Sequence, residues 1–213
     1  MVKTKEILRR VVLILFLLSL AITLTINARW LYSFDIGYLK ITDYTDYSRQ
    51  TILANYDDLM RYLNFFWIKT LHMTDFPTSS EGAFHFVEVK RLFQLNYAIL
   101  IVTIIPSIMY LYRLFKTKMV WTLLNMIRGI LLALAALTVF MLIAFDQFFV
   151  LFHEVFFNND AWIFYPETDP IILVLPQEYF FHCFALFFIQ FILCLAILLI
   201  VGKRELKKPV INN

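Results

Sequence analysis

Four long hydrophobic runs divide the sequence. Residues 11–28, 92–112 and 179–202 contain no Asp, Glu, Lys or Arg, and residues 119–145 contain only Arg128. A bilayer span needs about 20 predominantly apolar residues, which these runs supply directly or after extension by a few positions. The sequence therefore predicts an all-α membrane protein with four transmembrane helices, at about residues 7–26, 92–115, 120–145 and 178–202.

The polar residues concentrate in two long segments, residues 29–91 and 146–178. Within the first, residues 47–67 carry apolar side chains at the i, i+3, i+4, i+7 spacing of an amphipathic helix, and the alternation over residues 36–45 allows for a short strand. Segments of this length are usually functional or disordered, and these are too aromatic for disorder. We expect both to form a cap on a single membrane domain that comprises residues 1–213.

The basic residues are unevenly distributed and predict an orientation. Three regions are rich in basic residues: the N-terminus, the third apolar run together with the link before it, and the C-terminal tail. Together they contain only two acidic residues, Glu6 and Glu205. Cytoplasmic segments are enriched in Lys and Arg, so both termini are expected inside and the cap outside. This asymmetry favours contacts with membrane lipids and gives no indication of nucleic-acid binding. These regions contain 12 of the 19 basic residues: Lys3, Lys5, Arg9, Arg10, Arg113, Lys116, Lys118, Arg128, Lys203, Arg204, Lys207 and Lys208.

The histidines lie in one part of the predicted topology. All four (His72, His85, His153 and His182) fall in the cap segments or within one helical turn of them. Side chains there reach the layer in which lipid esters meet water. His85 and Glu88 are three residues apart on a predicted helix, so the carboxylate can orient the ring. Simple packing at the membrane interface is an equally good interpretation of His85 and of His153, and the better one for His72 and His182.

The familiar catalytic motifs are missing. There is no HExxH, CxxC, G-x-S-x-G or P-loop pattern, and no serine or cysteine in the context of a nucleophile. A metal site from His85, His153, His182 and a carboxylate is geometrically possible, but the spacing is not diagnostic. We therefore expect no metal and no other cofactor, and a histidine base that activates a nucleophile belonging to the substrate.

Three blocks of sequence resemble a known family. They are Gly82–Leu92 (GAFHFVEVKRL), Phe152–Trp162 (FHEVFFNNDAW) and Tyr56–Leu63 (YDDLMRYL). They are similar to the bacterial lipoprotein intramolecular transacylases, and the resemblance extends over nearly the whole chain, including the four-helix layout. It implies a multi-pass protein of the bacterial cytoplasmic membrane whose active site faces the outer leaflet.

The resemblance also implies a reaction. The substrate is a diacylated lipoprotein whose N-terminal cysteine carries a diacylglyceryl group and a free α-amine. The acyl chain at the middle glycerol position moves to that amine and leaves a lyso-form lipoprotein. An ester is exchanged for a more stable amide, so no cofactor is required.

The residues can be given roles in this reaction. We expect His85 to act as the general base, oriented by Glu88, and His153 to protonate the leaving oxygen or stabilise the oxyanion. Lys90, Arg61 and Asp160 are candidates for the oxyanion or for polar contacts with the substrate. The candidates for an acyl-chain groove are aromatic: Phe152, Phe156, Phe157 and Trp162.

Two other functions fit the same residues. One is a metal-dependent lipid hydrolase that uses the same histidines. The other is a non-enzymatic receptor or chaperone whose acidic cap docks a protein of the cell envelope.

Overall fold

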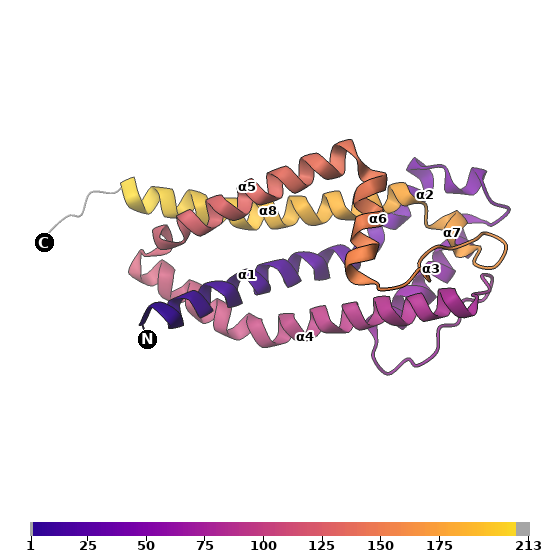
Figure 1. The fold of residues 1–213 in the computed structure, drawn as a ribbon, viewed down its shortest axis with the longest axis horizontal. Helices are drawn as coiled ribbons and strands as arrows, with labels where there is room; N and C mark the ends of the chain where they lie inside the picture. Colours follow the sequence, from indigo (N-terminus) through magenta and orange to yellow (C-terminus); the bar gives the residue numbers. More distant parts are fainter. Residues whose placement is uncertain (1, 208–213) are drawn as a thin grey trace, which may run out of the picture. The chain divides into compact units, whose positions relative to one another are not determined.

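A computed structural model describes residues 2–207, and within these the chain forms helices and connecting loops without a β-strand (Figure 1). The predicted all-α fold is therefore confirmed. Lys208, counted above in the basic tail, lies outside the described residues. The elements in chain order are α1 (Val2–Ile26), α2 (Arg29–Tyr38), η1 (Ile41–Asp43), α3 (Arg49–Asn64), α4 (Ser80–Thr117), η2 (Val120–Leu123), α5 (Leu124–Ile143), α6 (Phe145–Phe156), α7 (Ile171–Val174) and α8 (Gln177–Lys207).

The chain divides into two compact units. The first comprises Met1–Thr25, Tyr97–Ala144 and Ala185–Asn213 as far as these are described, and the second comprises Ile26–Asn96 and Phe145–Phe184. Helices α4 and α8 each contribute residues to both units. All four histidines belong to the second unit.

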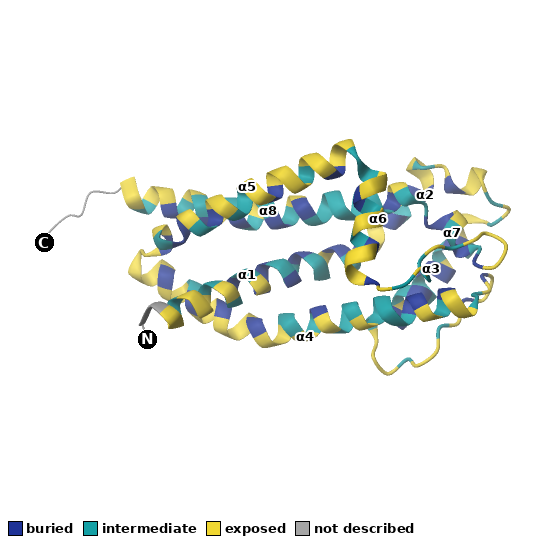
Figure 2. Cartoon of the chain, in the orientation of Figure 1, coloured by how far each residue is buried: buried dark blue, intermediate teal, exposed yellow. Residues whose placement is uncertain are grey.

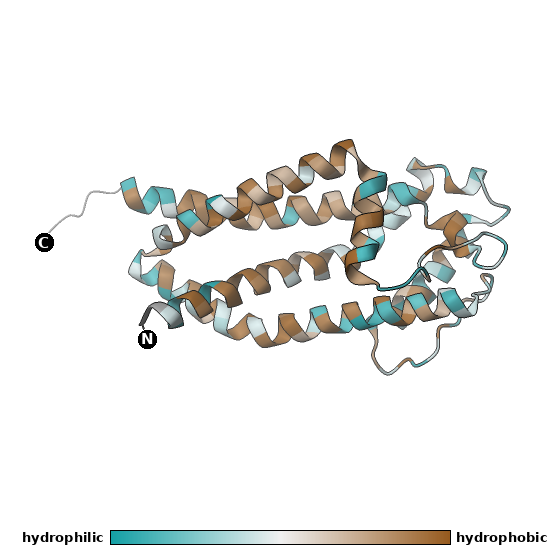
Figure 3. Cartoon of the chain, in the orientation of Figure 1, coloured by the Kyte–Doolittle hydropathy of each residue, from teal (hydrophilic) through white to brown (hydrophobic). Residues whose placement is uncertain are grey.

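Four helical segments are long and apolar enough to cross a membrane, as predicted: Thr4–Ile26, Ser80–Thr117, Val120–Ile143 and Gln177–Lys207. Figure 3 shows the apolar residues along these helices. Large apolar side chains of the first unit remain exposed, among them Ile143 at 81% and Leu132 at 73% (Figure 2). Exposure of such residues over whole helices is expected where the surrounding solvent is lipid.

Two hydroxyl groups of α4 bind α1 inside the first unit. The hydroxyl of Ser107 donates to the carbonyl of Val12 at 3.3 Å, and the Tyr110 hydroxyl donates to the carboxylate of Glu6. Gly202 lies so close to Leu124 that a Cβ built on it would be 3.0 Å from the leucine Cδ2. Small residues permit such close packing between helices in a membrane.

The amphipathic helix predicted at 47–67 is present in the second unit as α3. Ser48 is its N-cap and accepts a hydrogen bond from the Thr51 N–H at 3.1 Å. Ile52, Leu59 and Leu63, which share its predicted apolar face, are buried, whereas Phe66 and Trp67 at the predicted end of that face are exposed. The helix ends at Asn64, so Phe65, Phe66 and Trp67 form a loop instead of a last turn.

A cluster of three tyrosines joins the elements of the second unit. The rings of Tyr32 and Tyr56 stack with centroids 3.9 Å apart, and the Tyr56 and Tyr179 hydroxyls are 2.9 Å apart. The Tyr32 hydroxyl donates to the carbonyl of Val174 at 2.7 Å. Burial raises the pKa of Tyr56 to about 12, so its hydroxyl stays protonated. The cluster ties α2 and α3 to α7 and to the first turn of α8.

The strand allowed for at residues 36–45 does not form. This stretch is the end of α2 followed by the short helix η1, and Lys40 between them has a left-handed backbone with φ of 52°. A residue with positive φ ends the helix and turns the chain sharply, which an extended strand cannot accommodate. The alternation of side chains in the sequence was therefore misleading here.

Candidate active site

Two buried histidines from different helices meet in the second unit. His85 lies in the second turn of α4 and His153 near the end of α6, and both side chains are buried. Their ring centroids are 5.9 Å apart, with 36° between the ring planes. The structure therefore brings together the two residues that the sequence had singled out as the catalytic pair.

The protonation of His153 is set by its backbone contact. Its Nδ1 lies 2.7 Å from the carbonyl oxygen of Phe149, which can only accept, so Nδ1 carries the hydrogen. In the neutral ring Nε2 is then the unprotonated nitrogen. Burial lowers the pKa of His153, although the bond to Phe149 opposes this shift. The ring stacks on Trp162 with centroids 4.5 Å apart, so it is held as a neutral imidazole of fixed orientation.

His85 has a buried nitrogen without a partner. Among the described residues no atom forms a hydrogen bond with its Nδ1. The ring is enclosed by the edges of Phe157 and Phe164, at centroid distances of 4.7 and 5.6 Å. A buried polar atom without a partner is costly, and it marks a position where a ligand would supply the missing hydrogen bond.

Glu88, which was expected to orient the His85 ring, does not contact this nitrogen. Its carboxylate oxygens accept from the side-chain amide of Asn159 at 3.0 and 3.2 Å. The i, i+3 spacing places Glu88 and His85 on one side of α4, but the carboxylate finds its partner in the loop that follows α6.

The three proposed polar contacts lie in different settings. The Lys90 ammonium donates to the carbonyl oxygens of Phe65, at 3.0 Å, and of Ile68, and lies 4.0 Å from the centroid of the Tyr62 ring. These contacts close the loop after α3. Asp160 is exposed, and its carbonyl accepts from the N–H of Ile163 at 3.0 Å.

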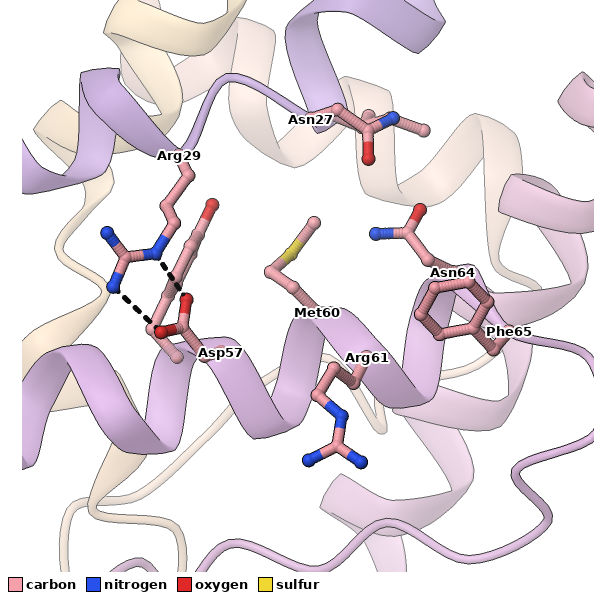
Figure 4. Close-up of a pocket in the computed structure, with 9 residues that line it drawn as sticks. Asn27, Arg29, Asp57, Met60, Arg61, Asn64 and Phe65 are labelled. Atoms are coloured by element: carbon pink, nitrogen blue, oxygen red, sulfur yellow. Dashed lines mark hydrogen bonds and ion pairs between the residues drawn. The ribbon is translucent and has the colours of Figure 1, made fainter.

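Arg61 lines a cavity of about 420 Å³ in the second unit (Figure 4). Across this cavity Arg29 donates two hydrogen bonds to Asp57, at 2.6 and 2.7 Å. The Arg61 guanidinium lies 3.6 Å from the carboxylate of Asp58, and 68% of its side chain is exposed. None of the four histidines lines this cavity.

Three of the four aromatic residues predicted to form an acyl-chain groove lie near the histidines, and one does not. Phe157 and Trp162 lie directly against the histidines, and Phe152 lies 5.5 Å from His153 between ring centroids. Phe156 is 52% exposed and contacts Phe152 instead.

The other two histidines lie elsewhere. His182 pairs through Nδ1 with the buried carboxylate of Asp35 at 2.8 Å, and His72 lines a separate cavity of about 360 Å³ with Lys69 and Phe76. No group of three or more His, Cys, Asp or Glu side chains within the described part of the chain could hold a metal ion.

A known protein family matches most of the chain. The family model described as lipoprotein intramolecular transacylase Lit matches residues 7–180. The chain belongs to the lipoprotein intramolecular transacylase family. Among the curated protein sequences, none matches the chain.

Solved structures of one family member have the same fold. The membrane-integral lipoprotein intramolecular transacylase Lit from Bacillus cereus is 31% identical, with 96% of this chain and 97% of that chain covered and a TM-score of 0.86. Structures of the Bacillus cereus protein with the H85R and H85A mutations give TM-scores of 0.78 and 0.77 at 30% and 31% identity. They cover 96% and 94% of this chain, and 93% and 91% of the other chain.

In this family member, several residues around the histidines were not predicted from the sequence. Phe149 fixes the tautomer of His153, Phe164 walls His85, and Asn159 binds Glu88. Asp169 is buried and accepts from the Ser79 N–H at 2.8 Å, immediately before α4 begins. The one available signal is the polar Asn158-Asn159-Asp160 run after an aromatic stretch, which is typical of a helix break but does not indicate a partner.

Proposed function

We propose that the protein moves the acyl chain from the middle glycerol ester of a diacylglyceryl-cysteine lipoprotein to the α-amine of the same cysteine, which yields a lyso-form lipoprotein. Family membership supports the reaction class. The observation that carries the proposal is the pair of buried histidines, 5.9 Å apart between ring centroids, one of them with an unpartnered nitrogen. The variant structures of the Bacillus cereus relative carry their substitutions at a histidine of the same number as His85, which supports that choice.

Two protons must leave the substrate amine, and the two histidines can each accept one. An α-amine has a pKa of about 7.7–8.0, so near neutral pH it is largely an ammonium and must lose two protons to become an amide nitrogen. His153, neutral and with Nε2 unprotonated, accepts the first proton. The free amine then attacks the ester carbonyl while His85 takes the second proton, and the C–N bond forms.

Collapse of the tetrahedral intermediate breaks the C–O bond to glycerol. The His153 imidazolium returns its proton to the leaving oxygen, and His85 releases its proton to water. The sum is one amide and one alcohol formed from one ammonium and one ester, with one proton released. Burial of His153 keeps the resting ring neutral, so that it is free to accept a proton, and makes the imidazolium a better acid towards the leaving oxygen.

The surroundings suit a lipid substrate. Phe157 and Trp162 present aromatic walls to the acyl chain beside the two histidines. Amine and ester belong to one molecule, so binding in the bent conformer supplies the proximity that a bimolecular reaction would lack. No enzyme nucleophile is required.

The proposal includes a topology. Both termini lie in the cytoplasm of a bacterium, four helices cross its cytoplasmic membrane, and the second unit forms the outer cap, where diacylated lipoproteins reside. The distribution of Lys and Arg supports this orientation. The partners are the lipoprotein substrate and the surrounding lipids.

The test is acyl-group location in a reporter lipopeptide by tandem mass spectrometry. His85→Ala and His153→Ala should each lower the rate of lyso-form production by about 10²–10⁴-fold, which is typical for loss of a general acid–base group. His72→Ala is the matched control, because this exposed histidine of the same unit lies outside the pair. Full activity in either variant would remove that histidine from the mechanism.

The product separates the competing functions. Free fatty acid, together with activity abolished by a chelator, would indicate a metal-dependent hydrolase. An unchanged lipopeptide that remains bound to the protein would indicate a receptor or chaperone.

A further inference from the structure

The side chains of Glu88 and Asn159 form a hydrogen-bonded contact in which the donor and the acceptor are known. A carboxylate only accepts, so the amide NH₂ of Asn159 must face Glu88, with distances of 3.0 and 3.2 Å. The other end of the same amide, Oδ1, accepts from the backbone N–H of Ala161 at 3.0 Å. Both ends of the Asn159 side chain are therefore engaged, one by α4 and one by its own loop.

This contact is joined to each of the two histidines by a short stretch of chain or a ring contact. Glu88 is three residues after His85 on α4. Ala161, held by Asn159, directly precedes Trp162, the residue on which the ring of His153 stacks. A path of short connections thus runs from the helix that carries His85 to the indole that supports His153.

We propose that Glu88 and Asn159 are positioning residues for acyl transfer. Together they fix Trp162 against His153 and thereby fix the separation of the two imidazoles. The inference rests on the proposed function and changes the role of Glu88. Its carboxylate holds the loop instead of the His85 ring, consistent with the unpartnered Nδ1 of His85.

The rest of the loop explains why the effect should fall on catalysis. Residues 157–170 contain no helix, and their far end is anchored separately by Asp169, which accepts from Ser79. Loss of the Asn159 contact leaves that anchor and the tyrosine cluster in place. The second unit should remain folded while Trp162 and His153 lose their exact placement, and a displacement of about 1 Å can cost about 10²-fold in rate.

The experiment exchanges donor and acceptor. N159D places a carboxylate opposite Glu88, so the two acceptors repel, and kcat should fall about 10²-fold while KM changes less than about threefold. E88Q keeps an acceptor oxygen for the Asn159 amide and should stay within about tenfold of wild type. In the double variant E88Q/N159D the new amide at position 88 donates to the new carboxylate at position 159, so most of the kcat lost in N159D should return.

Asn158→Asp is the control, because it makes the same change of charge at an exposed neighbouring position. Thermal unfolding in detergent reports folding of each variant, and if N159D does not fold, E88Q and the double variant still decide. Wild-type kcat in N159D, or in the double variant a kcat as low as that of N159D, would overturn the proposal. An E88Q variant as impaired as His85→Ala would show instead that the Glu88 charge acts directly. Absence of lyso-form product from the wild-type protein would contradict the proposed function itself. This outcome differs from failure of the positioning proposal, in which the wild-type protein remains active.

Discussion

The sharpest structural test is the substitution Gly82→Ala, because two effects of opposite sign compete at this position. Gly82 is the third residue of α4, and alanine in a helix is favoured over glycine by up to about 1 kcal/mol. A Cβ at Gly82 would, however, lie 2.2 Å from Oδ1 of Asp169, far inside contact distance. The neighbouring atom belongs to a buried carboxylate with fixed partners.

The cost follows from what Asp169 must give up. Its oxygens accept from the Ser79 N–H and from the Thr168 hydroxyl, each at 2.8 Å. A shift large enough to admit the methyl group breaks the bond to Ser79, and a hydrogen bond to a charged group contributes about 1.5–3 kcal/mol. Set against the helical gain, Gly82→Ala should destabilise the protein by about 1–2 kcal/mol.

The matched control is Gly129→Ala, because a Cβ at this helical glycine meets nothing within 4 Å. It should stabilise by up to about 1 kcal/mol, so the two variants should differ by about 2–3 kcal/mol. Thermal unfolding in detergent would separate them by about 4–12 °C, at about 2–4 °C per kcal/mol for a chain of this size. With Asp169→Ala already present, Gly82→Ala should become neutral or stabilising. A Gly82→Ala protein as stable as Gly129→Ala would refute the packing argument.

Three further predictions concern other contacts. Burial lowers the pKa of His153, so its imidazole binds a proton more readily in the unfolded chain than in the folded one. Stability should therefore fall as pH drops below about 6.5. His153→Asn should make the pH dependence of the unfolding temperature shallower. Lys90→Met removes the donor to two loop carbonyls and should lower the stability by about 2 kcal/mol, measured by thermal unfolding, while kcat falls less than tenfold. A decrease in kcat of about 10²-fold or more would instead support an oxyanion role for Lys90. Tyr32→Phe leaves the buried Val174 carbonyl without its donor and should cost about 1–3 kcal/mol by the same measurement, and an unchanged unfolding temperature would contradict this.

The four apolar helices and α3 were predictable because their signals are local. A membrane span is specified by composition over about 20 residues, and an amphipathic helix by the repeat of its apolar face. The separation of α5 from α6 was not predictable. It depends on Ala144, whose backbone leaves the helical region with φ of −138° and ψ of 58°, and an alanine gives no indication of a break.

The site was predictable in its residue types but not in its contacts. His85 and His153 could be selected because imidazole suits proton transfer from an amine and because the family resemblance covers both blocks. The partners of Glu88 and Lys90 lie 71 and 22–25 residues away in the chain, so local spacing could not reveal them. The i, i+3 rule states which side chains can meet, whereas hydrogen-bond competition with the rest of the fold decides which do.

The two anchors of the loop after α6 suggest why such a small site needs so much surrounding structure. His153 stacks on Trp162, and Trp162 follows Ala161, which is held by Asn159. The end of the loop is held by Asp169, which accepts from Ser79 immediately before α4. Both anchors lead back to the helix that carries His85. In the proposed reaction the nucleophile belongs to the substrate and no covalent bond to the enzyme forms, so the rate would depend on the placement of the two histidines. On this argument, substitutions at Asn159 and Asp169 should lower kcat more per unit of lost stability than substitutions in the tyrosine cluster, which lies outside this loop.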